Sequence, residues 1–248
     1  MRRTIERIRT VIREGRLQRQ TPDSIVHAVR STDAFAELLG RGDRPMLAGM
    51  QASPLGRRLL EERPDVLALV ADRDRLRSMP DGSLGREYCR FAEENGLHPE
   101  KLAADVREAR APTGGFVPNA SPELAWLHDR YRDLHDLRHV LSGYGTDMAG
   151  EWGIIAFETR QVGYRSLALL TFLHMTWRVL TTGRFDLLRL WFEGRRRGAR
   201  ARFLLAQDWE ALMPRPIEEV RRELGITPGR PYRPWSLPGQ PTGAVVRV

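Results

Sequence analysis

Two histidines and two carboxylates stand close together in the middle of the chain, and side chains of these types bind divalent metals. His135, Asp136 and His139 fall within five residues, and Glu151 follows twelve positions after His139. On an α-helix, which turns about 100° per residue, the first three side chains lie within an arc of roughly 100° and can point at one spot. Zinc and other first-row divalent metals take imidazole nitrogens and carboxylate oxygens as ligands. The spacing therefore predicts a metal site.

A short break after these three residues predicts how Glu151 joins them. Gly143-Tyr144-Gly145 interrupts the helical pattern, and Thr146 or Asp147 has a side chain suited to cap the start of a new helix. Glu151 then lies about one turn into that second helix, which folds back toward the first. We therefore expect a site between two consecutive helices.

The residues around the motif indicate that its helix is buried. Four apolar side chains surround the polar ones: Leu134, Leu137, Val140 and Leu141. A His–Asp pair on a helix is often a surface ion pair, but buried ionisable groups must be paired, hydrogen-bonded or metal-bound. Gly150 and Gly153 flank Glu151. Because each glycine costs a helix about 1 kcal/mol relative to alanine, we expect this pair to let the backbones of the two motif helices approach closely.

Composition narrows the class of protein. The chain has 248 residues, of which 41% are hydrophobic, and a formal net charge of +8 that favours anionic partners. Every basic residue except Lys101 is arginine, and Cys89 is the one cysteine, which excludes an intrachain disulfide. A reducing, cytoplasmic compartment fits this cysteine usage. Because no signal-peptide pattern and no run of about 18 to 20 apolar residues occurs, we expect no membrane-spanning segment.

The hydrophobic pattern predicts an all-α protein. Apolar residues recur at helical spacing and no useful stretch alternates, so we expect a single-domain helical bundle over residues 1–248. Residues 1–20 hold a basic amphipathic helix that either packs its apolar stripe on the core or lies on an anionic membrane surface. Ser121 and Pro122 are suited to begin the metal-motif helix. Residues 226–248 are rich in proline and glycine and predict a tail over the surface.

Further side chains near the motif are candidates for supporting roles, although plain structural packing is the alternative for each. Those on the face of the metal ligands would orient the ligands, and two arginines would meet an acidic headgroup. The orienting candidates are Tyr131, His128 and Glu158, and the headgroup candidates are Arg138 and Arg160.

One segment after Gly163 is apolar on most sides, which is typical of a helix that is buried or lines an apolar cavity. We predict a tunnel there, with ordinary core packing as an equal alternative. The side chains concerned are Leu167, Leu170, Phe172, Leu173, Met175 and Trp177.

The motif resembles that of a known family, coenzyme Q biosynthesis protein 4. Its hallmark is His-Asp-x-x-His, eleven residues and then Glu, which His135, Asp136, His139 and Glu151 match in full. Matching context extends over roughly residues 20 to 235. It includes Tyr131-Arg132-Asp133-Leu134 before the motif, Gly143 and Thr146-Asp147-Met148-Ala149-Gly150 within it, and Ala52-Ser53-Pro54-Leu55-Gly56, Leu59-Leu60, Glu62-Arg63-Pro64 and Gly82-Ser83-Leu84-Gly85 upstream.

The resemblance implies an all-helical, dimer-forming protein that holds a divalent metal on His135, Asp136, His139 and Glu151. Zinc is the favoured ion, and iron, manganese, cobalt or magnesium are alternatives. The family is associated with membrane faces, isoprenoid-tailed lipids and other ubiquinone-biosynthesis proteins. We therefore expect a homodimer, peripheral on the inner face of the membrane, whose apolar tunnel takes a prenyl tail.

The resulting hypothesis is a metal-dependent enzyme of ubiquinone biosynthesis that oxidatively decarboxylates a polyprenyl hydroxybenzoate, leaving a hydroxyl on the ring. The alternative is a non-catalytic prenyl-lipid scaffold that organises the enzymes of the pathway. A metal-dependent hydrolase is a third reading, but Asp136 stands where such sites carry a glutamate as general base. Nucleic-acid binding would depend on charge alone, with no recognised motif, and we do not expect it.

Overall fold

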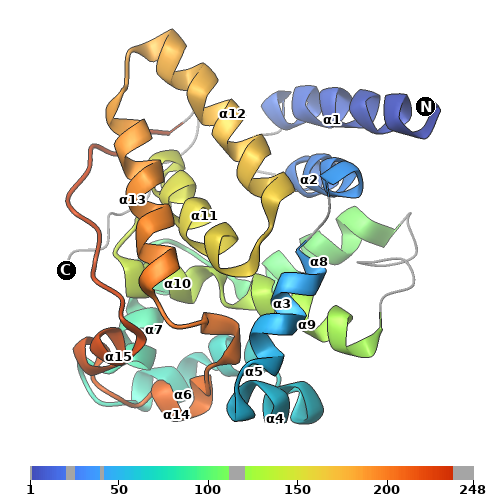
Figure 1. The fold of residues 1–248 in the computed structure, drawn as a ribbon. Helices are drawn as coiled ribbons and strands as arrows, with labels where there is room; N and C mark the ends of the chain where they lie inside the picture. Colours follow the sequence, from blue (N-terminus) through green and yellow to red (C-terminus); the bar gives the residue numbers. More distant parts are fainter. Residues whose placement is uncertain (1, 21–25, 40–41, 112–120, 237–248) are drawn as a thin grey trace.

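The computed structural model describes residues 2–20, 26–39, 42–111 and 121–236, and within them the regular structure is helical, which confirms the all-α prediction (Figure 1). An antiparallel bridge joins Ser83 to Pro216. The helices are α1 (Arg2–Gln20), α2 (Val26–Leu39), α3 (Asp43–Gln51), α4 (Pro54–Glu62), α5 (Val66–Ala71), α6 (Arg73–Ser78), α7 (Leu84–Glu94), α8 (Pro99–Arg110), α9 (Pro122–Asp133), α10 (His135–Ser142), α11 (Met148–Val162), α12 (Arg165–Thr182), α13 (Asp186–Arg200), the 3₁₀ turn η2 (Leu204–Ala206), α14 (Trp209–Leu212) and α15 (Ile217–Leu224).

Helix α11 lies at the centre and packs against α10, α12 and α13 (Figure 1). Small residues bring α11 and α13 together, because a Cβ added at Gly194 would lie 2.4 Å from the carbonyl oxygen of Gly153. A Cβ at Gly198 would lie 2.2 Å from the carbonyl oxygen of Phe157. One apolar core extends through the chain from Ala36 to Ile226. It therefore encloses the helices that carry the motif.

The predicted boundaries of the motif helices are confirmed at three points. Ser121 caps α9 by accepting a hydrogen bond from the Leu124 amide at 3.4 Å. Gly143, at φ 76°, ends α10 in the left-handed conformation that glycine favours. Asp147, not Thr146, caps α11 by accepting from the amides of Ala149 and Gly150.

The helix that we expected to be continuous from Ser121 through the motif is divided. Helix α9 ends at Asp133 and α10 begins at His135, with Leu134 between them at φ −85° and ψ −1°. Leu134 stays in the right-handed helical region and keeps its bonds to Arg130 and Arg138, so it forms a turn that joins the two helices. The motif therefore begins at the first residue of a new short helix.

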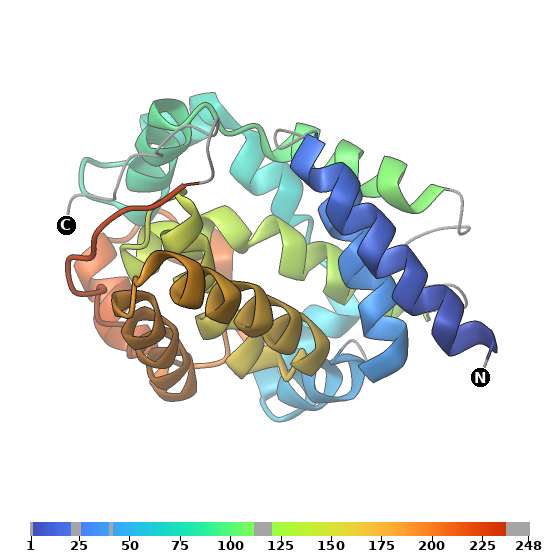
Figure 2. The same cartoon turned by 90° about the horizontal axis from the view of Figure 1, so that it is seen from above.

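The N-terminal helix was expected either to pack its apolar stripe on the core or to lie on a membrane surface, and in the structure much of that stripe is not packed. Helix α1 packs on α2, but Ile5, Ile8 and Ile12 remain 44%, 47% and 52% exposed. Figure 2, which views the molecule from above, shows α1 and α12 on the same face. The exposed isoleucines therefore leave apolar surface uncovered on the N-terminal helix.

Helix α12 is not apolar and buried all round. Its buried residues are Ser166, Thr171, Met175 and Val179. A second stripe, with the helical spacing of neighbours along one face, is exposed to solvent: Leu169 (42%), Leu173 (54%), Trp177 (63%) and Leu180 (71%). No helix among the described residues is both long and apolar enough to cross a membrane.

Candidate metal centre

The two motif histidines and Glu151 converge, as the spacing predicted. Nε2 of His139 lies 3.2 Å from Nε2 of His135. The two carboxylate oxygens of Glu151 lie 3.3 Å from His135 Nε2 and 3.4 Å from His139 Nε2. Ligand atoms bound tetrahedrally at about 2.0 to 2.1 Å from zinc would stand about 3.3 to 3.4 Å apart. Each imidazole thus stands at the spacing of two ligands of one metal ion from the other imidazole and from one of the two Glu151 oxygens. One ligand atom from each of the three residues lies within 4.8 Å of the other two, and the group could hold a metal ion.

The partner of His139 Nδ1 fixes how that imidazole presents its other nitrogen. Nδ1 lies 3.1 Å from the carbonyl oxygen of Tyr144, which only accepts hydrogen bonds, so Nδ1 carries the proton. The Nε2 lone pair therefore faces Glu151. The ring of Phe91 stacks on His139 with centroids 6.0 Å apart and holds the imidazole plane. His139 is thus oriented and protonated as a metal ligand requires.

His135 lies beside the buried carboxylate of Glu158, which Tyr131 also contacts, and the orienting role of these two residues stays a prediction. Nδ1 of His135 lies 3.4 Å from Oε2 of Glu158, to which Arg138 Nη1 donates at 2.7 Å. The Tyr131 hydroxyl donates to Oε1 of Glu158 at 2.7 Å. A carboxylate behind a histidine fixes the tautomer and makes the imidazole a better metal ligand. Both Nε2 atoms and the Glu151 carboxylate then face one another, an arrangement that a shared proton or a metal cation in its place stabilises.

The charges of the cluster reinforce one another. Burial would raise the pKa of Glu151, but the imidazoles of His139 and His135 outweigh it and hold that pKa well below its usual range. Burial would lower the pKa of His135, but the carboxylates of Glu158 and Glu151 raise it well above the ordinary histidine value. Burial likewise opposes the lowered pKa of Glu158, which His135 and Arg138 impose. Both glutamates therefore stay ionised at neutral pH.

One side of the cluster is open. The side chains of His135 and Glu151 keep 24% and 28% of their surface exposed, whereas that of His139 keeps 1%. Catalytic zinc sites use three protein ligands and leave a position for water or substrate. Asp136 is not one of the three converging residues. Burial raises the pKa of Asp136, and the nearby imidazoles only partly counteract this effect. Its role as a fourth ligand stays a prediction.

A segment near the C-terminus holds the loop between α10 and α11, a contact that no sequence pattern predicted. We call residues 226–236 the C-terminal arm. The Tyr232 hydroxyl donates to Asp147 at 2.6 Å and accepts from the Gly145 amide at 2.9 Å. The Trp235 amide donates to Asp147 at 2.9 Å. Asp147 therefore receives donors from both α11 and the arm. The described part of the predicted tail thus acts as a clamp on the loop between α10 and α11. Residues 237–248 lie outside the described part.

Two other sequence-predicted residues have different roles. His128 is buried and pairs through Nε2 with Asp43 at 2.7 Å, which connects it to α3. Arg138 is 2% exposed, and its Nη1 donates to Glu158 and to the Tyr131 carbonyl oxygen. Arg138 thus compensates a buried carboxylate instead of meeting a headgroup.

Arg160 also faces away from the cluster. It lies nine positions after Glu151 on α11, and nine steps of about 100° place it half a turn away. Arg160 instead lines a pocket formed by α11, α12 and α13.

The six side chains predicted to line one tunnel point in different directions. Met175 is buried in the core, and Leu173 and Trp177 are exposed to solvent. Phe172 lines the pocket of α11, α12 and α13, while Leu167 and Leu170 are partly buried. A helix turns side chains two or three positions apart to different faces, so this set does not enclose a common channel in the structure.

The fold and the cluster define an all-α protein with a candidate metal-binding group of two histidines and a glutamate. A family model described as Coenzyme Q (ubiquinone) biosynthesis protein Coq4 matches residues 43–229. The chain therefore belongs to the Coq4 family, which confirms the resemblance.

Similar proteins agree with this assignment. The protein named ubiquinone biosynthesis protein COQ4 homolog, mitochondrial, from Danio rerio is 37% identical over 181 residues, which are 71% of this chain and 61% of that protein. The protein of the same name from Nematostella vectensis is 32% identical over 193 residues, 77% of this chain and 88% of that protein. A crystal structure of a Nostoc punctiforme protein shares the fold with a TM-score of 0.62 at 23% identity, covering 88% of this chain and 96% of that one.

Proposed function

We propose that this protein is a metal-dependent enzyme of ubiquinone biosynthesis that oxidatively decarboxylates a polyprenyl hydroxybenzoate. The ring carbon that bears the carboxyl group would receive a hydroxyl in its place. Membership of the Coq4 family supports the pathway. The observation that supports the chemistry is the convergence of His135, His139 and Glu151 on one partly open spot.

The residues of the cluster have separable roles in this proposal. His135, His139 and Glu151 would hold a divalent ion, with zinc favoured, and Asp136 is the candidate fourth ligand. A bound ion supplies Lewis acidity and a template for an anionic substrate. Glu158 keeps Nε2 of His135 free, and the Tyr144 carbonyl does the same for His139. Because exchanging carboxyl for hydroxyl removes two electrons from the substrate and zinc has no redox chemistry, an oxidant such as dioxygen must accept them.

The proposed setting is a membrane surface. The prenyl tail of the substrate would lie in apolar surroundings, and the exposed apolar side chains of α12 and α1 support a peripheral position. We further propose a homodimer that works beside other ubiquinone-biosynthesis proteins, on the cytoplasmic, inner face of the membrane.

A scaffold that binds prenyl lipids without turnover is the second candidate, and the same exposed apolar surface favours it. Metal-loaded protein incubated with prenylated 4-hydroxybenzoate and oxygen separates the two. Carbon dioxide release that disappears in His139→Ala supports the enzyme. Lipid binding without carbon dioxide release, equal in wild type and variant, supports the scaffold.

A further inference from the structure

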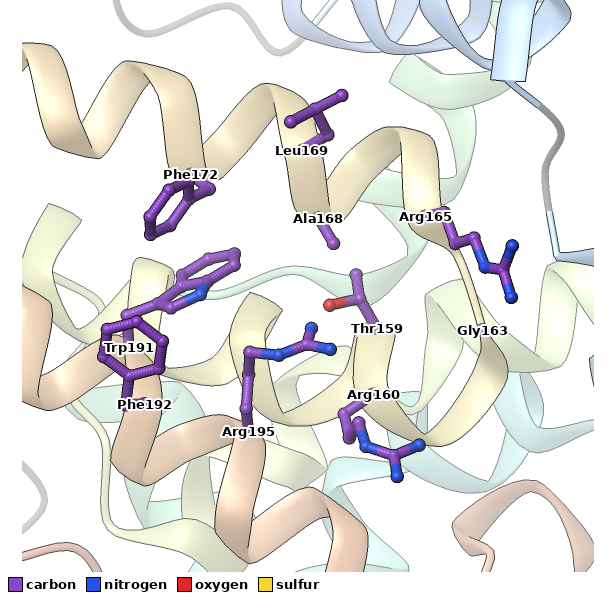
Figure 3. Close-up of a pocket in the computed structure, with 10 residues that line it drawn as sticks. All are labelled: Thr159, Arg160, Gly163, Arg165, Ala168, Leu169, Phe172, Trp191, Phe192 and Arg195. Atoms are coloured by element: carbon purple, nitrogen blue, oxygen red, sulfur yellow. The ribbon is translucent and has the colours of Figure 1, made fainter.

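A pocket of about 510 Å³ lies between α11, α12 and α13, on the side of α11 opposite the metal cluster. Figure 3 shows that its lining is divided. The aromatic side chains gather at one end, and the guanidinium groups of Arg160 and Arg165 lie at the other, with Arg195 between them. The aromatic residues are Phe172, Trp191 and Phe192. The volume is within the range of about 300 to 1,000 Å³ that is typical of organic-ligand pockets.

The positive charge of this pocket is not compensated by the protein. No aspartate or glutamate is among the described residues that line it. Arg160, Arg165 and Arg195 form no salt bridge with any carboxylate of the described chain, whereas Arg77, Arg110 and Arg184 each pair with one. Burial lowers the pKa of Arg195, and the neighbouring guanidinium of Arg160 lowers it further. Like charges held together without an acid are relieved by a bound anion.

The donors available to such an anion are the guanidinium groups. The Thr159 hydroxyl, at the same end of the pocket, already donates to the Ile155 carbonyl oxygen at 2.5 Å. Guanidinium groups bind phosphate and carboxylate oxygens by paired, charge-assisted hydrogen bonds. The chemistry of this end therefore selects a phosphate or carboxylate group.

The other end of the pocket opens onto apolar surface. Phe192 and Leu169 line the pocket and are 60% and 42% exposed. Leu169 belongs to the exposed stripe of α12 that continues to Leu173 and Trp177. A small inorganic anion would contact the arginines alone and leave these side chains in water. An anion that carries an apolar chain would cover them, with a gain of about 25 cal/mol for each Å² buried.

We propose that this pocket binds the headgroup of an anionic lipid, with the phosphate or carboxylate between Arg160, Arg165 and Arg195 and the hydrocarbon chain against Phe172, Phe192 and Leu169. This proposal rests on the membrane setting of the proposed function and adds to it a specific contact with a lipid headgroup. It uses none of the metal-cluster residues. The lipid-site proposal and the proposed metal-dependent chemistry can therefore be refuted independently of each other.

Monomeric short-chain lipids test the site without the general attraction of a charged bilayer. Dihexanoyl phosphatidic acid, dihexanoyl phosphatidylcholine and inorganic phosphate are titrated into the full chain by calorimetry below the micelle concentration. We expect phosphatidic acid to bind at least about tenfold more tightly than the other two probes, because only it satisfies both ends of the pocket.

Two pairs of variants locate the site. Arg195→Gln should weaken phosphatidic acid binding about tenfold, whereas Arg196→Gln, the same charge change at the exposed neighbour on α13, should alter it by less than about twofold. Phe192→Ser should weaken the lipid and leave inorganic phosphate unchanged, and Leu180→Ser, an exposed residue outside the pocket, should change neither.

Equal effects of the Arg195 and Arg196 substitutions would overturn the proposal. So would inorganic phosphate binding as tightly as the lipid, phosphatidylcholine binding as tightly as phosphatidic acid, or no lipid binding at all. Metal content is measured on every variant and should match the wild type. Lost lipid binding with full metal content then concerns this pocket, whereas lost carbon dioxide release with intact lipid binding concerns the proposed function.

Discussion

Replacing Glu158 by glutamine should change both the orientation of His135 and the stability of the core, and a second substitution separates the two effects. Glu158 is 3% exposed and accepts from Arg138 and Tyr131 at 2.7 Å each, with His135 Nδ1 3.4 Å away. Glutamine keeps the size but removes the charge, so the 2%-exposed guanidinium of Arg138 loses its counter-ion. Breaking one half of a buried ion pair costs about 3 to 5 kcal/mol. At about 2 to 4 °C per kcal/mol, Tm should fall by roughly 6 to 20 °C.

The same substitution should weaken metal binding by about 10- to 100-fold, because the imidazole of His135 loses the carboxylate that fixes its tautomer. Chemical denaturation measures the stability, and competition with a chromophoric chelator measures the affinity at a temperature where the variant is folded.

Adding Arg138→Met to Glu158→Gln provides the control. Removing both charges should restore most of the lost stability, since replacing a buried pair by apolar groups is often close to neutral. Metal affinity should remain low in this double variant, because the acceptor for His135 is still uncharged. Wild-type metal affinity in either variant would refute the assigned role of Glu158. Affinity recovered together with stability would show that the single variant lost metal only through poor folding.

Three further predictions concern the clamp on the loop between α10 and α11, the contact of Gly150 with that loop, and the N-terminal helix. Tyr232→Phe removes the hydroxyl shared by Asp147 and Gly145 and should lower the free energy of unfolding by about 1 to 2 kcal/mol and weaken metal binding, measured by denaturation and chelator competition; unchanged values of both would contradict the clamp. Gly150→Ala should destabilise by about 1 to 3 kcal/mol because its Cβ would lie 2.0 Å from the Gly145 carbonyl oxygen, whereas Gly15→Ala, with no atom within 4 Å, should not; equal Tm values for the two variants would disprove the tight contact. Burial opposes the low pKa of Glu14, but the contacts with His27 and Arg13 outweigh burial and lower that pKa. The ionised Glu14 therefore stabilises α1 in full above the unfolded pKa of about 4.3. This stabilisation is lost as the pH falls through the lower pKa of the folded state. Hydrogen exchange of α1 amides between pH 5 and pH 3 should show this loss in wild type and not in Glu14→Gln, and identical pH profiles would contradict it.

Local signals in the sequence predicted the centre of the site well. The spacing of His135, His139 and Glu151 and the glycine break at Gly143 sufficed to place three donor atoms together, because helix geometry fixes which side chains share a face. Gly150 and Gly153 have a packing reason, as helical glycines require, but it is not the predicted approach of two helices. A Cβ at Gly150 would meet the Gly145 carbonyl oxygen in the preceding loop, and a Cβ at Gly153 would meet the Tyr144 ring.

Tertiary context decided what the sequence could not. Tyr232 and Trp235 reach Asp147 across more than 80 positions and carry no motif, so their clamp on the loop between α10 and α11 had no local signal. Arg138 reads as a surface cation until the buried Glu158 is placed beside it. The apolar run of α12 could not show which of its faces meets the core, because an apolar stripe looks the same in sequence whether it is buried or exposed.

The metal content of the protein shows whether His135, His139 and Glu151 bind an ion. The full chain, purified without added metal, is measured by elemental analysis beside His135→Ala and the exposed control Arg196→Gln. We expect close to one divalent ion per chain in wild type and in Arg196→Gln, and loss of that ion in His135→Ala. A metal-free wild type that also fails to take up zinc, or an ion retained in full by His135→Ala, would contradict it.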